Sequence, residues 1–132
     1  MDNYKKVILD ASAVIAFLKK ENGYMEVQEV IHKAVISSIN ATEIAKYIHS
    51  ENKLSIEDTK KIIDSIFEEI VPFNGEQIYM NASLVSQTKR YGLSLGDRAC
   101  IALGQITGYP VYTTDRIWKE IGIPNVDIRL IR

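Results

Sequence analysis

The amino-acid sequence predicts an α/β protein with a parallel sheet. Short apolar runs alternate with longer segments whose apolar residues recur every three or four positions. Hydrophobic residues make up 46% and charged residues 25% of the 132 residues, which is ordinary globular usage and excludes a disordered or fibrous chain. No linker or internal repeat divides the chain, so we expect one domain over residues 1–132.

The strands are predicted from short apolar runs that end at polar or turn-forming residues. Val7-Ile8-Leu9 is wholly apolar and ends at Asp10. Pro72 lies within the third run, which places that strand at an edge of the sheet because proline cannot donate a ladder hydrogen bond. The predicted strands span residues 7–9, 35–37, 70–73, 110–114 and 126–130.

The segments between these strands are predicted to be helical from the spacing of their apolar residues. The first of them is apolar nearly all round, which predicts burial between layers. Two others are expected to begin with a capping box, in which a polar cap is followed three residues later by an acid, at Asn40–Glu43 and Ser55–Asp58. The predicted helices span residues 12–20, 26–34, 40–48, 55–67, 76–91, 96–107 and 116–120.

Charge and composition indicate which partners and which cellular compartment suit this chain. The net charge of −1 neither requires nor excludes nucleic acid, which would need a local basic patch. Asp10 interrupts the first apolar run, and no run approaches the roughly 18–20 residues of a membrane span, so we expect neither a signal peptide nor a membrane segment. Cys100 is the only cysteine and cannot form an internal disulfide, which favours a reducing, cytoplasmic location.

Four acidic residues are predicted to meet at one edge of the sheet. Asp10 and Asp115 follow predicted strands, whereas Glu43 and Asp97 lie at predicted helix starts. In open parallel sheets, ligands bind beyond the carboxyl ends of the strands. Any one of these acids could be a helix cap. The four together, beside small or hydroxyl residues such as Ser12, favour a common site.

The chemistry of this set points to a hard cation. Four convergent carboxylates repel one another by several kcal/mol unless protons or cations neutralise them. No Cys or His accompanies them at ligand spacing, and oxygen ligands favour Mg²⁺ or Mn²⁺. Paired hard cations on carboxylates are the apparatus of phosphodiester hydrolysis.

Four motifs, which together span nearly the whole chain, carry a resemblance to a known family. They are VILDASA at 7–13, INATEI at 39–44, LSLGDRACIAL at 93–103 and YTTDR at 112–116. The third is the most specific. On these motifs the sequence resembles the PIN-domain nucleases, and among them the VapC toxins of VapBC toxin–antitoxin systems.

The resemblance implies a fold, an activity and partners. Such proteins have a three-layer αβα fold with a five-stranded parallel sheet of order 3-2-1-4-5, and they are Mg²⁺- or Mn²⁺-dependent endoribonucleases. The family's acidic quartet falls on Asp10, Glu43, Asp97 and Asp115, and its hydroxyl positions fall on Ser12 and Thr114. The three aspartates would mainly hold metal, and Glu43 would hold it through water or help to orient the nucleophile. A VapB-like antitoxin and a homodimer are also implied, the latter through a spare apolar helix such as 56–67.

Three basic residues near the predicted site have two interpretations. Arg98 and Arg116 each follow a site acid, and Lys46 lies one turn after Glu43. They could bind RNA phosphate or pair with neighbouring carboxylates, and the sequence favours neither. Cys100, on an apolar helix, is predicted to be a core residue rather than a nucleophile.

Other functions fit the sequence less well. A haloacid-dehalogenase-like phosphatase would need a second Asp where Ser12 stands, and a phosphorelay receiver domain would need an acidic neighbour of Asp10 and a late Lys. A PIN domain that serves only as a binding module would be expected to have lost one of the four acids. A free-standing PIN nuclease that acts in RNA processing, without an antitoxin, is the alternative to the toxin.

Overall fold

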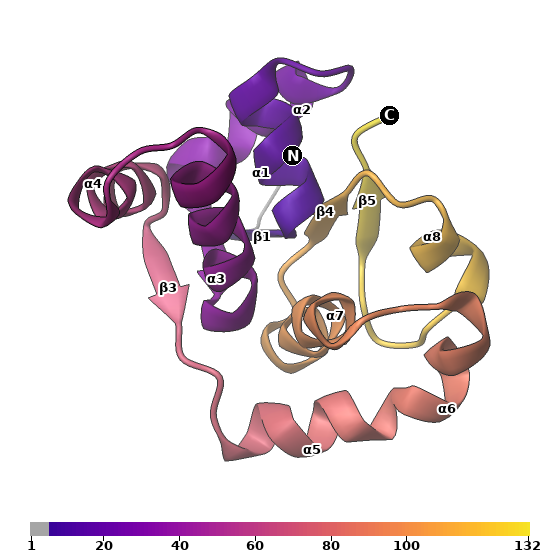
Figure 1. Cartoon of the computed structure of the whole chain (residues 1–132). Coiled ribbons are helices and arrows are strands. Elements are labelled where there is room, and N and C mark those ends of the chain that lie inside the picture. Colours follow the sequence, from indigo (N-terminus) through magenta and orange to yellow (C-terminus); the bar gives the residue numbers. More distant parts are fainter. Residues whose placement is uncertain (1–5) are drawn as a thin grey trace.

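A parallel sheet lies at the centre of the fold. The computed structural model describes residues 6–132, so residues 1–5 of the predicted domain lie outside the described part. The strands of this part are β1 (Val7–Leu9), β2 (Ala34–Ser37), β3 (Glu69–Val71), β4 (Val111–Thr113) and β5 (Ile128–Leu130). Their order is β3-β2-β1-β4-β5, with every neighbouring pair parallel and β3 at an edge, which confirms the predicted topology (Figure 1).

The sheet separates two hydrophobic cores. Because successive side chains of a strand point to opposite faces, Val7 and Leu9 enter one core, whereas Ile8 enters the other. In β2, Ile36 and Val35 divide in the same way. All residues of β1 and β2 are buried, as expected of parallel strands that helices cover on both faces.

Helices form the two outer layers of the predicted αβα arrangement. Residues of α1 to α4 pack in the core that contains Leu9, and residues of α7 and α8 pack in the core that contains Ile8 (Figure 1). The helices are α1 (Ala11–Lys19), α2 (Tyr24–Val30), α3 (Ser38–Lys46), α4 (Ile56–Ile66), α5 (Gly75–Ser83), α6 (Val85–Thr88), α7 (Leu95–Thr107) and α8 (Ile117–Ile121). Across residues 6–132, none of the helices has the length and apolar character needed to cross a membrane.

The second predicted helix, 26–34, is displaced in the structure. α2 begins two residues earlier and ends at Val30, and Ile31–Lys33 then forms a 3₁₀ turn. Ala34 belongs to β2 because it pairs with Val7 of β1. Pairing with the central strand thus overrides the helical spacing of this segment.

The predicted capping box at Asn40–Glu43 is wrong. α3 begins two residues before Asn40, and its cap is Ser37, whose hydroxyl accepts the N–H of Ile39 (3.2 Å). Asn40 and Glu43 therefore lie within the helix, on one face. Polar and acidic residues three positions apart are typical of a capping box, but also of a side-chain contact along a helix, so the spacing alone did not separate the two.

The long helix predicted for 76–91 is divided into three segments. α5 ends at Ser83, α6 is a single turn, and Lys89–Tyr91 forms a 3₁₀ turn. The Thr88 hydroxyl donates to the carbonyl oxygen of Leu84 (2.7 Å), and both side chains are buried. A bond of this kind, from a side chain to the preceding turn, is one that often bends helices.

α7 is the most buried helix, and it carries the third motif. A Cβ at Gly104 would lie 2.5 Å from Val111 Cγ2 and 2.8 Å from Val126 Cγ2. Glycine therefore allows α7 to lie directly against β4. This close packing fixes the start of α7 near the carboxyl end of β1, where the predicted site lies.

Candidate active site

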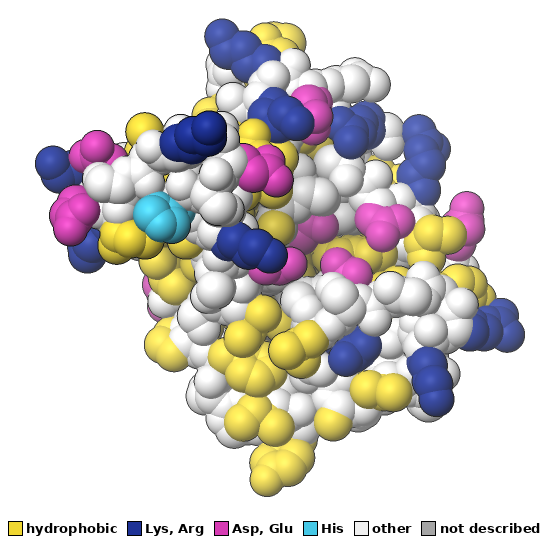
Figure 2. Space-filling view, viewed as in Figure 1, with side chains coloured by type: hydrophobic (Ala, Val, Ile, Leu, Met, Phe, Trp, Pro, Cys, Tyr) yellow, Lys and Arg dark blue, Asp and Glu magenta, His cyan; other side chains and the backbone are white. Residues whose placement is uncertain are grey.

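The carboxyl ends of β1 and β4 lie side by side at the centre of the sheet. Leu9 pairs with Tyr112 across these strands, so Asp10 and Asp115 leave the sheet at the same edge, as the sequence predicted. Acidic side chains gather near the centre of the face shown in Figure 2, and Lys and Arg side chains border them. This edge is the candidate active site.

Asp10 is a buried carboxylate with three hydrogen-bond donors. It caps α1 by accepting the N–H of Ala13 (2.8 Å), and it accepts the hydroxyls of Ser12 (2.7 Å) and Thr113 (2.6 Å). The residue is only 5% exposed. Burial raises the pKa of Asp10 to about 6, because the three hydrogen bonds offset the lost hydration only in part and the negative charge of Asp97 adds to the rise.

Two hydroxyl groups join Asp10 to the fourth motif. The Ser12 hydroxyl also accepts the backbone N–H of Thr114 (3.1 Å), and the Thr113 hydroxyl also accepts the N–H of Asp115 (3.1 Å). Ser12 thus contacts Asp10 directly, whereas Thr114 contributes its backbone N–H. The sequence analysis missed Thr113, which is fully buried. Its place at the end of the strand next to β1, level with Asp10, is the signal that could have found it.

Asp97 and Asp115 each take part in the start of a helix. Asp97 Oδ2 accepts the N–H of Ser94 (2.9 Å) and the Ser94 hydroxyl accepts the N–H of Asp97 (3.1 Å), which forms a capping box for α7. Asp115 Oδ1 accepts the N–H of Ile117 (3.0 Å), the first residue of α8. Within residues 6–132, the other carboxylate oxygen of each aspartate has no hydrogen bond, so both can cap a helix and still bind a ligand.

Glu43 reaches the site from α3 and is exposed. Its Oε1 accepts a hydrogen bond from Asn40 Nδ2 (2.8 Å), which also donates to the carbonyl oxygen of Gly96 (3.0 Å). A Cβ at Gly96 would lie 2.5 Å from Glu43 Oε1, so glycine allows this carboxylate to lie against the residue that precedes Asp97. Asn40 is a second site residue that was not predicted, because its spacing from Glu43 is equally typical of a helix cap.

Cys100 lies near enough to three of the acids for their charges to affect its thiol. It is buried in α7, as predicted for a core residue. Burial raises the pKa of its thiol well above the ordinary value, and the negative charges of Asp10, Asp97 and Glu43 raise it further. The thiol is therefore within the electrostatic reach of three of the four acids. In the described part of the chain, however, no three His, Cys, Asp or Glu side chains lie close enough together to hold a metal ion in common.

The chemistry of the donor set fits a hard divalent cation. Every candidate ligand atom is a carboxylate or hydroxyl oxygen, which Mg²⁺ and Mn²⁺ prefer. A cation would also oppose the two causes that raise the pKa of Asp10, namely burial and the negative charge of Asp97. Because like charges repel, a bound cation would also draw the acids together.

The three basic residues differ in their surroundings. Arg98 is half-buried and donates to Asn81 Oδ1 on α5 (3.3 Å) and to a backbone carbonyl in the preceding loop (2.9 Å). Arg116 is exposed just before α8, and Lys46 is exposed on α3, where it lines a groove together with Glu43. Among residues 6–132, none of the three forms an ion pair with a site acid.

Comparison with known proteins agrees with this geometry. The sequence model of the PIN domain family matches residues 7–124, a segment that includes all four acids. A comparison with curated proteins finds no match.

Several solved structures have a similar fold. A chain in the DNA-bound VapBC structure from Salmonella typhimurium superposes with a TM-score of 0.72 and 18% identity, covering 98% of this chain and 100% of that chain. VapBC2 from Rickettsia felis, bound to a DNA fragment from its promoter, gives a TM-score of 0.71 and 20% identity, with 94% and 97% covered. VapC20 from Mycobacterium tuberculosis, a sarcin–ricin loop cleaving toxin, gives 0.68 and 10%, with 92% and 99% covered.

The identities to these structures are low, so the similarity concerns the fold. The family match is independent of it and covers most of the chain. The sheet order is also the one that the resemblance implied. The chain belongs to the PIN domain family.

Proposed function

We propose that this PIN domain is a Mg²⁺- or Mn²⁺-dependent endoribonuclease and the toxin of a toxin–antitoxin pair. The observation that carries the nuclease proposal is the buried Asp10 carboxylate with Glu43, Asp97 and Asp115 on neighbouring segments. The fold of this chain is similar to that of VapBC chains, and one similar structure is a toxin that cleaves the sarcin–ricin loop. This similarity supports RNA as the substrate. We expect this activity in the cytoplasm.

The site residues would divide the work according to their position. Asp10, Asp97 and Asp115 would hold the cation, and Glu43 would hold it through water or orient the attacking water. When bound, the cation lowers the pKa of water and neutralises the charge that develops on the phosphate. Ser12 keeps the Asp10 carboxylate in one orientation by donating its hydroxyl proton to it.

RNA phosphate would be bound at the exposed edge of the site. Lys46 is exposed on α3, which also carries Glu43, and Arg116 is exposed directly after Asp115. Cations at such positions attract phosphate. Arg98 is less suited to this role because it donates two hydrogen bonds within the protein. We assign Arg98 instead to holding the start of α7.

A VapB-like antitoxin is the proposed partner. A group of carboxylates attracts any cation, including an Arg or Lys side chain, and Arg can bind a carboxylate through two parallel hydrogen bonds. An antitoxin segment that directs such a residue at the acids would compete with metal and cover the RNA site. This partner distinguishes a toxin from a free-standing PIN nuclease of RNA processing, which would need none.

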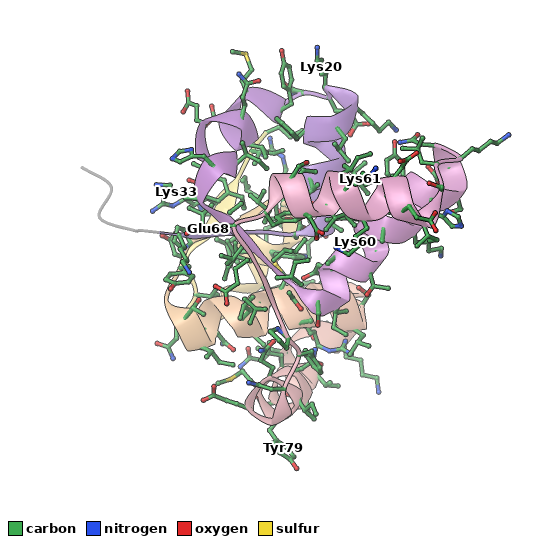
Figure 3. The ribbon with its side chains drawn as sticks, turned by 90° about the vertical axis from the view of Figure 1, so that its left-hand side faces the viewer. Lys20, Lys33, Lys60, Lys61, Glu68 and Tyr79 are labelled. Carbon is green, nitrogen blue, oxygen red and sulfur yellow. The ribbon has the colours of Figure 1, made fainter. Side chains whose placement is uncertain are left out.

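The proposal includes a homodimer through a surface that we call the α5 face. Its exposed apolar side chains are Ile78 (49%), Tyr79 (77%), Val85 (38%) and Leu95 (55%). Apolar side chains gather where α5 lies (Figure 2), and Tyr79 points away from the protein (Figure 3). α5 carries a single charged residue, Glu76. Exposed apolar and aromatic residues with few charges are typical of the core of an interface.

The helix expected to offer the dimer surface, 56–67, is less suited to it. Ile63 and Phe67 are buried in the core, and Ile62 and Ile66 pack against it. Only Ile56 of this apolar stripe is largely exposed. The apolar residues of this helix therefore pack in the core of their own chain. We assign the dimer surface to the α5 face instead.

Asp97→Asn is expected to abolish RNA cleavage while leaving the fold intact. Asparagine keeps an oxygen that can accept the Ser94 N–H, so the cap of α7 survives, whereas the lost charge weakens cation binding. Cleavage of RNA in Mg²⁺ should fall by about 100-fold or more, and EDTA should stop cleavage by the unchanged protein.

Asp58→Asn is the matched control for this variant. Asp58 occupies the same third position of α4 behind the cap Ser55, whose hydroxyl accepts its N–H (3.0 Å), but it lies outside the site. The control should cleave RNA at the original rate. Strong cleavage in EDTA, or unfolding of the Asp97→Asn protein, would contradict the proposal.

The pH dependence of stability should report the buried charge of Asp10. Its pKa rises from 3.8 to about 6 on folding, so between these pH values the folded state binds the proton more tightly than the unfolded state. The free energy of unfolding should therefore fall as pH rises through this window, by up to about 3 kcal/mol. Urea denaturation from pH 4 to pH 7.5 should show this fall in the wild type but not in Asp10→Asn.

Mg²⁺ should reverse this loss. A cation that binds the ionised carboxylate stabilises the folded state at pH 7, and it should do so less at pH 5, where Asp10 is protonated. Parallel pH curves for the wild type and Asp10→Asn would show that the carboxylate carries no such penalty.

Tyr79→Glu tests the homodimer. A charge on the most exposed apolar residue of the α5 face should cost enough on dimerisation to leave the protein monomeric at micromolar concentration. Met25→Glu is the control because Met25 is also exposed (62%) but lies on α2, away from the α5 face. Light scattering should give twice the chain mass for the wild type and the control. A wild-type mass of one chain would refute the dimer.

A further inference from the structure

Asn40 is a buried amide that touches one site acid and the backbone beside another. It is 2% exposed and lies on α3, three residues before Glu43. Its Nδ2 donates both to Glu43 Oε1 (2.8 Å) and to the carbonyl oxygen of Gly96 (3.0 Å), the residue before Asp97. One NH₂ group thus connects a carboxylate on α3 to the first turn of α7.

The orientation of this amide is fixed by its neighbours. A carboxylate and a carbonyl are acceptors only, so the NH₂ group and not the amide oxygen must face them. Asn40 Oδ1 is buried, and it has no hydrogen-bond partner in the described part of the chain. A buried acceptor without a partner disfavours folding. The two donor contacts are therefore kept at a cost, and a core position would be served better by an apolar residue.

The contact determines where the Glu43 carboxylate lies. Glu43 is exposed and, without a partner, its side chain could turn into solvent. Its Oε1 instead occupies the space where a Cβ of residue 96 would be, because Gly96 has none. That position brings it toward the negative charge of Asp97, which would repel it. The hydrogen bond from Asn40 opposes this repulsion.

We propose that Asn40 is a positioning residue that holds the Glu43 carboxylate in place for a divalent cation. Asn40 Nδ2 donates a hydrogen bond to Glu43 Oε1. Glu43 Oε2, which has no hydrogen bond within residues 6–132, stays available to the cation or to a water bound to it. This inference rests on the proposed function, in which the four acids bind Mg²⁺ or Mn²⁺. Partners that orient a metal ligand in this way typically contribute 10- to 100-fold to metal affinity.

A purely structural role for Asn40 would be to tie α3 to α7. Asn81 provides the comparison, because it is a buried amide (5% exposed) that ties α5 to the same turn. Its Nδ2 donates to the carbonyl oxygen of Leu95 (3.2 Å) and its Oδ1 accepts from Arg98. It makes two hydrogen bonds, as Asn40 does, but touches no acid. Loss of Asn81 reports what loosening of α7 alone does.

The experiment measures Mn²⁺ binding to the RNA-free protein by calorimetry, with thermal denaturation of each variant as a check of folding. The variants are Asn40→Ala, Glu43→Gln, the double variant of these two, and Asn81→Ala. We expect Asn40→Ala to weaken Mn²⁺ binding by about tenfold or more. In the Glu43→Gln background the same change should have no further effect, because it acts through that carboxylate. Asn81→Ala should bind Mn²⁺ within about twofold of the wild type while losing thermal stability.

Three results would overturn the role of Asn40. These are unchanged Mn²⁺ affinity in Asn40→Ala, equal losses in Asn40→Ala and Asn81→Ala, and an undiminished effect of Asn40→Ala in the Glu43→Gln background. If Asn40→Ala does not fold, Asn40→Ser, which keeps one donor, takes its place in the same cycle with the same expectations at smaller size. Wild-type protein that bound no Mn²⁺ would instead refute the proposed function itself, and this role with it.

Discussion

Asp10 carries a carboxylate into the interior where β1, α1 and β4 meet. Its hydrogen-bond donors come from the elements that it joins, because Ser12 and Ala13 belong to α1 and Thr113 belongs to β4. These hydrogen bonds hold the three elements together, yet the pKa of Asp10 is still raised to about 6. At neutral pH Asp10 therefore carries a negative charge that its buried surroundings disfavour. A divalent cation would remove this conflict while retaining the ionised carboxylate.

Packing that builds the core also places the remaining acids. Gly104 lets α7 lie against β4, which fixes the first turn of that helix and Asp97 within it. Gly96 leaves space for Glu43 from α3. Asp10, Asp97 and Asp115 each accept a backbone N–H at the start of a helix, and Glu43 accepts the amide of Asn40. A cation beside these carboxylates would offset their mutual repulsion.

Much of this arrangement could be predicted because it depends on local rules. A wholly apolar run ending in Asp10, and a second run ending before Asp115, place two acids at one sheet edge once the strands are known to be parallel and adjacent. Contacts between residues far apart in the sequence could not be predicted from such local rules. The spacing of Asn40 and Glu43 fitted a cap as well as a side-chain contact, and only the approach of Gly96 on α7 separates the two. The burial of Thr113 likewise depends on the neighbouring strand.

The most direct test of the cation site is anomalous diffraction from crystals of the protein grown with Mn²⁺. We predict a Mn²⁺ peak at the carboxyl ends of β1 and β4, beside the Asp10 carboxylate. The peak should be lost in Asp97→Asn crystals of the same form. Crystals in which Mn²⁺ occupies other positions while the space beside Asp10 holds no ion would contradict the account.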